Sequence, residues 1–421
     1  MSLDWPADRA LPLFPDIARQ IEYANLSAFS SDEQLLLTSL QGLVNRQQPR
    51  LYLDWPQRRE ESDDLINEAW REQLEAKGVQ GVDVTSGPFQ SIDKYKSNVR
   101  GAIVYDVKVP DTINLASTMA GIFDAVLATE ELAQRFDIPI SRISEVASKT
   151  STSYVWPNVT DRLITAIKPL STTLYANRTW DTLLKTNSSV TDASNNGTYR
   201  IDLTRFINRS NTVYPGYHGV NAIFRDYIVA TAAPCVWLDS NRPREAALLD
   251  NILHQFQPNT AYLGWVPNGD EMSGVTQLAR HGVYVAATDF YFNPTIFSEF
   301  RRGDQSQQPS QTESSSRLPL RNSTEIFLSL VYLEGDNIQY NQRRMFTHWN
   351  DAARGSVPLG WTISPLLRDI GPGILSYYQA TSTENDLLVA GPDGAGYTYP
   401  GVWPGGALSV ELATLTLIFK L

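Results

Sequence analysis

Residues 235–287 read CVWLDSNRPREAALLDNILHQFQPNTAYLGWVPNGDEMSGVTQLARHGVYVAA. Three short apolar runs, at 235–238, 262–265 and 283–287, are separated by longer stretches. In the first of these, 242–257, apolar side chains recur at the spacing of one helix face. Strands and helices that alternate at this spacing are typical of a parallel sheet covered by helices. The stretch therefore predicts an α/β fold.

The same alternation extends in both directions from this stretch. An S-x-x-Q capping box at Ser31 and Gln34 predicts the start of a helix that contains several leucines. Further segments of the N-terminal part read as strands at 51–53, 102–105 and 125–128, and as helices at 64–77 and 115–121. On the C-terminal side, strands are predicted at 327–333, 358–363 and 387–390. The first of these is apolar on both faces and is expected to be buried.

These patterns divide the chain into three parts. Residues 1–140 form an N-terminal α/β region, and residues 141–212 form a loop-rich connection dense in Ser, Thr and Asn. Residues 213–421 contain six strands in βα order, which predicts a (β/α)-barrel-like domain whose chemistry lies at the C-terminal ends of its strands. A full barrel needs two more strands. Either the barrel is incomplete, or N-terminal segments close it, or the chain is truncated.

Composition and charge exclude several classes of function. The net charge is −11 and no basic run occurs, so nucleic acid is not expected as a partner. No apolar run reaches the roughly 18 residues of a membrane span. The single cysteine, Cys235, excludes an intramolecular disulfide and a cysteine-rich zinc site. We expect no cofactor and a monomeric protein.

Glycosylation signals favour a secreted or extracellular protein. Seven Asn-x-Ser/Thr sequons occur, and five of them begin between residues 158 and 208 in a polar stretch. The N-terminus lacks the basic start and apolar core of a signal peptide, which argues the other way unless the chain begins after processing. The 19 Tyr and 10 Trp residues, with abundant Asn, suit a protein that binds carbohydrate, because aromatic rings stack on sugar faces and amides bond to hydroxyls.

Acidic side chains follow several of the predicted strands. The carboxylates are those of Asp239, Asp270, Glu271, Asp289, Glu334, Asp336 and Asp393. Parallel strands end at one rim, so these groups are expected to come close together. Like charges brought close raise one another's pKa, which can give one protonated acid and one ionised base at the same pH. Enzymes that cleave glycosidic bonds need such a pair.

Glu271 and Asp336 are the preferred catalytic pair, with Glu334 and Asp289 in reserve. A helix N-terminus stabilises an ionised carboxylate, which suits Glu271 to the ionised role and leaves Asp336 as the candidate acid. The alternatives are structural. Acidic residues open helices for the same electrostatic reason, and the turn at 334–337 can be an N-cap or a hard-metal site. No EF-hand spacing accompanies that turn, and we expect no metal.

The remaining candidate residues would bind substrate. Aromatic walls are predicted from Trp265, Trp361, Tyr397 and Tyr399, and further contacts from Asn337, Asp393, Gly394, Gly396 and His218. Two glycines let the backbone turn sharply and approach a ligand. Tyr397 and Tyr399 alternate, so they share one face of an extended segment. The alternative is a structural turn in which both rings are buried.

Residues 394–400, GAGYTYP, match the motif that gives the GxGYxYP family of glycoside hydrolases its name. Other segments also resemble that family, namely LQGLVNR at 40–46, LGW at 263–265, GDN at 335–337 and PLGWTISP at 358–365. The resemblance covers nearly the whole chain. It implies a multi-part N-terminal region, a barrel-like domain and sugar chemistry. Two departures are the Glu at 334, where the family more often has Asp, and the short length of chain after the motif.

Three functions remain open from the sequence. The first is a glycoside hydrolase that acts on a polysaccharide or oligosaccharide through the carboxylate pair. The second is a carbohydrate-binding protein that keeps the fold without turnover. The third is a carbohydrate-active enzyme of another reaction type, such as a lyase or an esterase.

Overall fold

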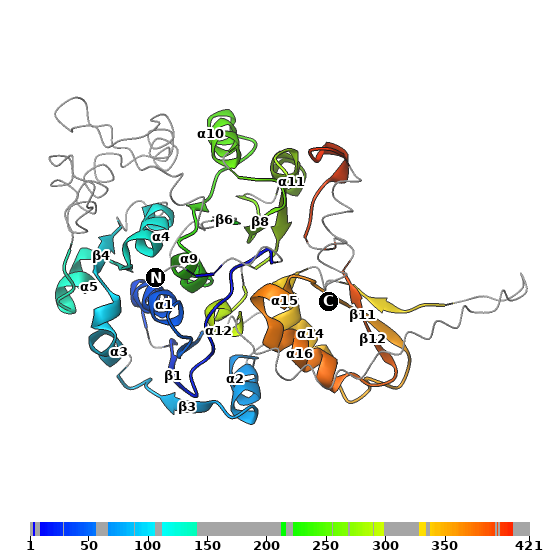
Figure 1. Ribbon diagram of the computed structural model, residues 1–421, viewed down its shortest axis with the longest axis horizontal. Helices are drawn as coiled ribbons and strands as arrows, with labels where there is room; N and C mark the ends of the chain where they lie inside the picture. Colours follow the sequence, from blue (N-terminus) through cyan, green and yellow to red (C-terminus); the bar gives the residue numbers. More distant parts are fainter. Residues whose placement is uncertain are drawn as a thin grey trace, which may run out of the picture.

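The computed structural model in Figure 1 describes residues 3–4, 9–27, 29–55, 66–87, 89–105, 112–140, 212–215, 222–254, 256–267, 270–288, 290–298, 328–333, 337–391, 394 and 396–406. Within them, the strands form four parallel sheets flanked by helices. The predicted α/β class is therefore confirmed. In the same part of the chain, every helix is too short or too polar to cross a bilayer.

Two sheets lie in the N-terminal third. The first has the order β2-β1-β3, with β1 at Gln20–Asn25, β2 at Leu51–Asp54 and β3 at Gln80–Asp83. The second pairs β4 (Gly101–Val104) with β5 (Ala125–Ala128). Their helices are α1 (Ser31–Asn45), α2 (Ile66–Ala76), α3 (Gln90–Lys94), η1 (Lys96–Asn98), α4 (Thr112–Phe123) and α5 (Glu130–Arg135). Ser30, and not Ser31, caps α1, and its partner in the capping box is Glu33.

Helix α9 (Arg225–Thr231) joins this N-terminal part to the rest of the molecule. All its residues are buried, and it packs against α1 and α4. At Gly42 of α1, an added Cβ would lie 2.4 Å from the carbonyl oxygen of Asp226. The close contact between the two helices therefore requires glycine at this position.

A four-stranded sheet of order β7-β6-β8-β9 follows. Its strands are β6 (Thr212–Pro215), β7 (Cys235–Val236), β8 (Thr260–Leu263) and β9 (Val283–Ala286), and its helices are α10 (Pro243–Leu253), α11 (Glu271–Arg280) and α12 (Pro294–Phe297). Alternate residues of β9 enter different hydrophobic clusters, Val285 one and Tyr284 the other. Both faces of β8 and β9 are therefore buried, as parallel strands require.

The C-terminal sheet has the order β10-β11-β12, with β10 at Val331–Tyr332, β11 at Leu359–Ile363 and β12 at Asp386–Ala390. Its helices are α13 (Ile338–Gln342), α14 (Arg344–Trp349), α15 (Leu367–Ile370), α16 (Pro372–Thr381) and η6 (Pro400–Val402). Trp70 of α2 is buried against rings of this part and donates a hydrogen bond from its indole to the Gln342 carbonyl at 2.7 Å. The N-terminal and C-terminal parts are therefore in direct contact.

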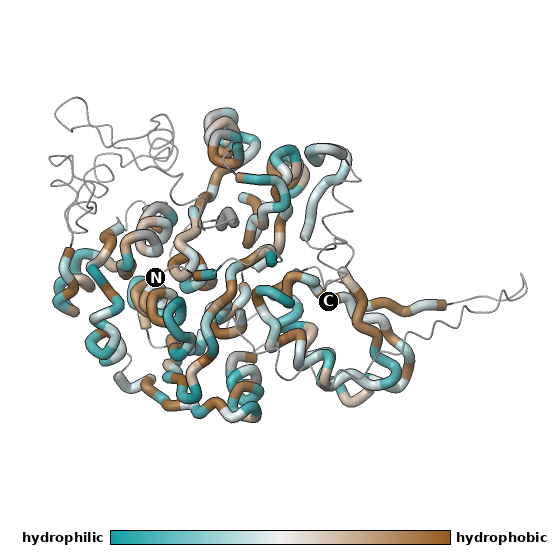
Figure 2. Tube along the Cα trace, in the orientation of Figure 1, coloured by the Kyte–Doolittle hydropathy of each residue, from teal (hydrophilic) through white to brown (hydrophobic). Residues whose placement is uncertain are grey.

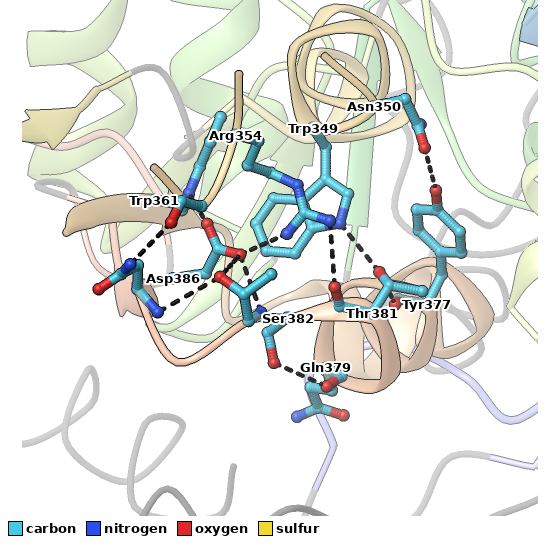
Figure 3. Close-up of polar contacts among 12 residues, drawn as sticks. Trp349, Asn350, Arg354, Trp361, Tyr377, Gln379, Thr381, Ser382 and Asp386 are labelled. Carbon is cyan, nitrogen blue, oxygen red and sulfur yellow. Dashed lines mark hydrogen bonds and ion pairs between the residues drawn. The ribbon is translucent and has the colours of Figure 1, made fainter. Parts of the chain in front are cut away.

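Figure 3 shows the polar network of the C-terminal sheet. The Asp386 carboxylate accepts hydrogen bonds from the Trp361 indole at 2.9 Å and from the backbone and hydroxyl of Thr383, and it forms an ion pair with Arg354. Burial alone would raise the pKa of Asp386, but these hydrogen bonds and the charge of Arg354 outweigh it and hold the pKa below its ordinary value. The network fastens β12 to β11 and to the end of α16.

The predicted barrel is not closed among the described residues. The strands assigned to it divide between the four-stranded sheet and the C-terminal sheet. The edge of β9, where the next barrel strand would pair, is occupied instead by Tyr397, which forms an antiparallel bridge with Val285. The next strand, β10, pairs with β11. A backbone edge used by one segment is not available to another, so the barrel cannot continue there.

The prediction that the strand at 327–333 is buried is wrong for the residues that can be described. Leu328 is 84% exposed and Leu333 is 56% exposed. Figure 2 shows β10 as an apolar segment at the margin of the molecule. An apolar pattern on both faces predicts burial only when a second layer covers the strand, and the sequence cannot say whether one does.

Candidate functional site

The loops that follow β7, β8 and β9 meet at one edge of the four-stranded sheet. Because these strands are parallel, their C-terminal ends point to the same side. After β7, the side-chain amide of Asn241 donates a hydrogen bond to Asp270, which follows β8, at 2.5 Å. This edge is the place where open α/β sheets bind ligands, and it contains the candidate site.

Asp270 and Glu271 begin helix α11 at this edge. Asp270 is the N-cap, and its carboxylate accepts a hydrogen bond from the backbone N–H of Ser273 at 3.2 Å. Hydrogen bonds from Asn241 and Ser273 lower the pKa of Asp270. Glu271 is the first helical residue and is exposed. The structural role expected of an acidic N-cap therefore belongs to Asp270, which leaves the side chain of Glu271 at the surface.

The GAGYTYP segment reaches the same edge from the C-terminal part. Tyr397 exchanges two backbone hydrogen bonds with Val285 of β9, at 2.8 and 2.6 Å. A Cβ on Gly396 would lie 2.3 Å from the Tyr284 ring and 2.8 Å from the Val285 carbonyl oxygen, so only glycine permits this contact. Gly394 has a positive φ of 59° in the preceding turn. The closest approach of Gly396 is therefore to strand β9.

Two tyrosines, a tryptophan and Glu271 form a cluster here. The rings of Trp265 and Tyr397 are nearly parallel, at 8°, with centroids 6.1 Å apart. The Tyr397 hydroxyl donates a short hydrogen bond to Glu271 Oε1 and lies 3.2 Å from the Tyr399 hydroxyl. The hydrogen bond to Glu271 is the largest cause that raises the pKa of Tyr397, followed by the bond to Tyr399. The structure thus brings together four residues that the sequence singled out.

A second group of polar residues lies at the end of β9. The backbone N–H of Gln339 in α13 donates to the Ala287 carbonyl at 3.3 Å. The side-chain oxygen of Gln339 accepts a hydrogen bond from the backbone N–H of Phe290 at 2.5 Å. Asn337 caps α13 and accepts a hydrogen bond from the N–H of Tyr340 at 3.3 Å. The structural role predicted for this turn, an N-cap, is therefore present. These contacts bring the chain that follows residue 336 to the β9 end of the same sheet edge.

Several predicted site residues lie outside the described residues. They are His218, Asp289, Glu334, Asp336 and Asp393. Their roles remain predictions. Among the described residues, no cluster of three His, Cys, Asp or Glu side chains is arranged to hold a metal ion.

Trp361 is not part of this cluster. It lies in β11 of the C-terminal sheet, is 3% exposed and donates its indole N–H to Asp386. Its ring packs against Trp349 and Tyr332. A tryptophan with both faces in the core cannot present one to a sugar, so the predicted aromatic wall is reduced to Trp265 and the two tyrosines.

Sequence reasoning missed Asn241 and the bond from Tyr397 to Glu271. Asn241 follows the predicted strand at 235–238 by three residues, in the polar stretch Asp-Ser-Asn, a signal that could have marked it. The bond between Tyr397 and Glu271 joins residues 126 positions apart. No local pattern predicts such a pair.

Comparison with models of known protein families shows which family the chain is related to. Four models of one family match in order: its first domain at residues 20–97, its second domain at 99–156, its third domain at 216–299, and the "GxGYxYP putative glycoside hydrolase C-terminal domain" at 324–419. The chain belongs to the GxGYxYP family. In this GxGYxYP protein, the cluster described above combines Trp265 and Glu271 of the third domain with Tyr397 and Tyr399 of the C-terminal domain.

One solved structure has the same fold. It is described as the crystal structure of a putative hydrolase from Bacteroides thetaiotaomicron VPI-5482. The match has a TM-score of 0.67 at 20% sequence identity and covers 100% of this chain and 72% of that one. No curated protein sequence matches the chain.

Proposed function

We propose that this GxGYxYP protein is a glycoside hydrolase that acts on a polysaccharide or oligosaccharide at the C-terminal edge of the four-stranded sheet. One observation carries the proposal: an exposed carboxylate, Glu271, lies in contact with the ring-lined cluster of Trp265, Tyr397 and Tyr399. Aromatic faces beside a carboxylate suit both the binding and the cleavage of a sugar. The family's description as glycoside hydrolases supports the same conclusion.

In the proposed mechanism Glu271 acts as the ionised carboxylate. A hydrogen bond donated by Tyr397 and a position at the N-terminus of α11 both stabilise its charge. Asp336 is proposed as the acid that protonates the leaving oxygen, with Glu334 and Asp289 in reserve. Asn337, Asp393 and His218 are proposed to bind substrate. A retaining enzyme needs the two carboxyl groups about 5–5.5 Å apart and an inverting one about 6.5–9.5 Å.

The test is release of reducing ends from a panel of polysaccharides. We expect the wild type to cleave at least one of them, and both Glu271→Gln and Asp336→Asn to lower kcat by about a hundredfold or more. Nuclear magnetic resonance of the first-formed sugar distinguishes retention from inversion. Sugar binding without any reducing ends would favour the non-catalytic alternative, and unsaturated or deacylated products would indicate a lyase or an esterase.

We also propose that the protein is a secreted, N-glycosylated monomer. The support is the sequon cluster at 158–208. Material from a eukaryotic secretory host should run faster on a gel after treatment with an N-glycosidase, and should elute as a monomer from a sizing column. Unchanged mobility would contradict glycosylation.

A further inference from the structure

The hydrogen bonds around Tyr397 have one consistent direction. A phenol has one hydrogen to donate, and an ionised carboxylate can only accept. The Tyr397 hydrogen therefore goes to Glu271, which leaves the Tyr397 oxygen to accept from Tyr399, 3.2 Å away. Tyr399 therefore donates to Tyr397, and Tyr397 donates to the Glu271 carboxylate. We call this chain of two hydrogen bonds the relay.

Tyr397 is also fixed from two other directions. Its backbone N–H and carbonyl each form a hydrogen bond with Val285. The glycine at position 396 has no Cβ and so permits this close contact. Its ring lies parallel to that of Trp265. The backbone, the ring and the hydroxyl of Tyr397 are each in contact with a neighbour, so its side chain is already ordered. It therefore loses little further conformational entropy when it holds Glu271 in place.

We propose that Tyr397 is a positioning residue for Glu271: it holds the carboxylate in one orientation, and Gly396 and Tyr399 hold Tyr397. The motif that names the family would then act on a carboxylate of the third domain, in addition to any contact of its rings with the sugar. Each domain alone has only half of the arrangement. The inference rests on the proposed function for its catalytic consequence, but the arrangement itself can be tested without a substrate.

The electrostatic surroundings of Glu271 make this test specific. Tyr397 is hydrogen-bonded to Glu271, the Tyr399 hydroxyl lies beside that of Tyr397, and Asp270 precedes Glu271 as the N-cap of α11. The Asp270 carboxylate already accepts hydrogen bonds from Asn241 and Ser273. The raised pKa of Tyr397 follows mainly from its bond to Glu271, so linkage requires that the Glu271 charge and the Tyr397 proton depend on each other.

The first experiment follows tyrosine ionisation by nuclear magnetic resonance in full-length protein labelled at the tyrosine ring carbon that bears oxygen. Tyr397→Phe identifies the signal, and Tyr23→Phe, in β1 of the first domain, is the control. In the wild type we expect Tyr397 to keep its proton above the pH at which exposed tyrosines ionise. In Glu271→Gln its ionisation should move down by more than about one pH unit. Identical titration in both proteins would overturn the proposal.

The second experiment uses a substrate that the polysaccharide panel identifies. Tyr397→Phe should lower kcat by about tenfold to a hundredfold and change KM by less than about threefold. Tyr23→Phe should change none of these. A raised KM with unchanged kcat would show instead that Tyr397 binds sugar and does not position Glu271. If the wild type cleaves nothing, the proposed function fails while the ionisation experiment still decides the relay.

Discussion

Asp386 in the C-terminal sheet and Glu271 at the edge of the four-stranded sheet each accept a hydrogen bond from an aromatic side chain, but they differ in how many donors they meet. Asp386 is buried and accepts from the indole of Trp361, from the backbone and hydroxyl of Thr383, and from Arg354 (Figure 3). Glu271 is exposed, and within the described residues it accepts one side-chain hydrogen bond, from Tyr397.

This difference separates a structural carboxylate from one that can act on a ligand. At Asp386, Oδ2 accepts from Arg354 and twice from Thr383, and Oδ1 accepts from the Trp361 indole. Because Asp386 is buried, a substrate hydroxyl cannot reach it. Glu271 keeps acceptor positions and solvent access. Aromatic neighbours alone therefore do not identify a sugar site, because both carboxylates have them.

Removal of Asp386 should have the largest effect. Asp386→Ala leaves Arg354 and the Trp361 indole without their partner, and breaking such a buried pair costs about 3–5 kcal/mol. We expect a loss of this size in the free energy of unfolding, measured by urea denaturation. Glu384→Ala changes an exposed acid two residues away and should stay within about 0.5 kcal/mol of the wild type. If the two variants lost the same free energy of unfolding, Asp386 would have no special structural role.

Asp226 is a second buried carboxylate, and its effect on stability should depend on pH in the opposite direction to that of Asp386. Burial raises the pKa of Asp226 to about 6 from an ordinary 3.8, although hydrogen bonds from Thr295 lower it. The folded state then holds a proton that the unfolded state has released between about pH 4 and 6, so stability falls as pH rises through that window, by up to about 3 kcal/mol. Asp386 has the opposite sign, because its pKa is lowered.

The measurement is the free energy of unfolding against pH. Asp226→Asn keeps the shape of the side chain but cannot titrate, so the decline in stability between about pH 4 and 6 should become smaller in this variant. The contribution of Asp386 should instead be lost as pH falls below about 4. An unchanged pH profile in Asp226→Asn would show that another group titrates in the window.

Gly396→Ala tests the contact that assembles the site. Its new methyl group would overlap the Tyr284 ring and the Val285 carbonyl, and overpacking of this kind costs about 1–3 kcal/mol. Gly401→Ala in the same segment meets nothing within 4 Å and should be neutral within about 0.5 kcal/mol. Urea denaturation compares the two. If both variants match the wild type, the backbone contact with β9 is not tight.

Local features of the fold were predictable from the sequence. The alternation of strands and helices gave β5 its bounds and most other elements to within a few residues, because periodicity depends on neighbouring residues alone. The capping box was misplaced by one residue, since Ser30 with Glu33 and Ser31 with Gln34 fit the same pattern. Strand β1, QIEYAN, was missed because its alternation of polar and apolar side chains covers only four residues.

Long-range relations were not predictable. Nothing in the sequence indicates that Tyr397 would take the edge of β9 that the barrel assigned to β10. For the site, Trp265, Glu271, Tyr397 and Tyr399 could each be named from motifs and from their places after strands. Trp361 satisfied the same criteria and is buried. Sequence identifies residue types near strand ends, whereas burial and partners depend on packing between distant segments.

Glu271→Gln should have the smallest effect on stability, and this expectation tests the comparison most directly. Glu271 is exposed at the first turn of α11, and a glutamine oxygen can still accept the Tyr397 hydrogen. We expect the free energy of unfolding in urea to stay within about 0.5 kcal/mol of the wild type. Asp386→Asn, the matched amide variant, should lose more, because both carboxylate oxygens accept hydrogen bonds and an amide nitrogen cannot replace either as an acceptor. A loss above about 2 kcal/mol in Glu271→Gln would make Glu271 a structural carboxylate like Asp386, and the proposed catalytic role would then have no distinguishing feature.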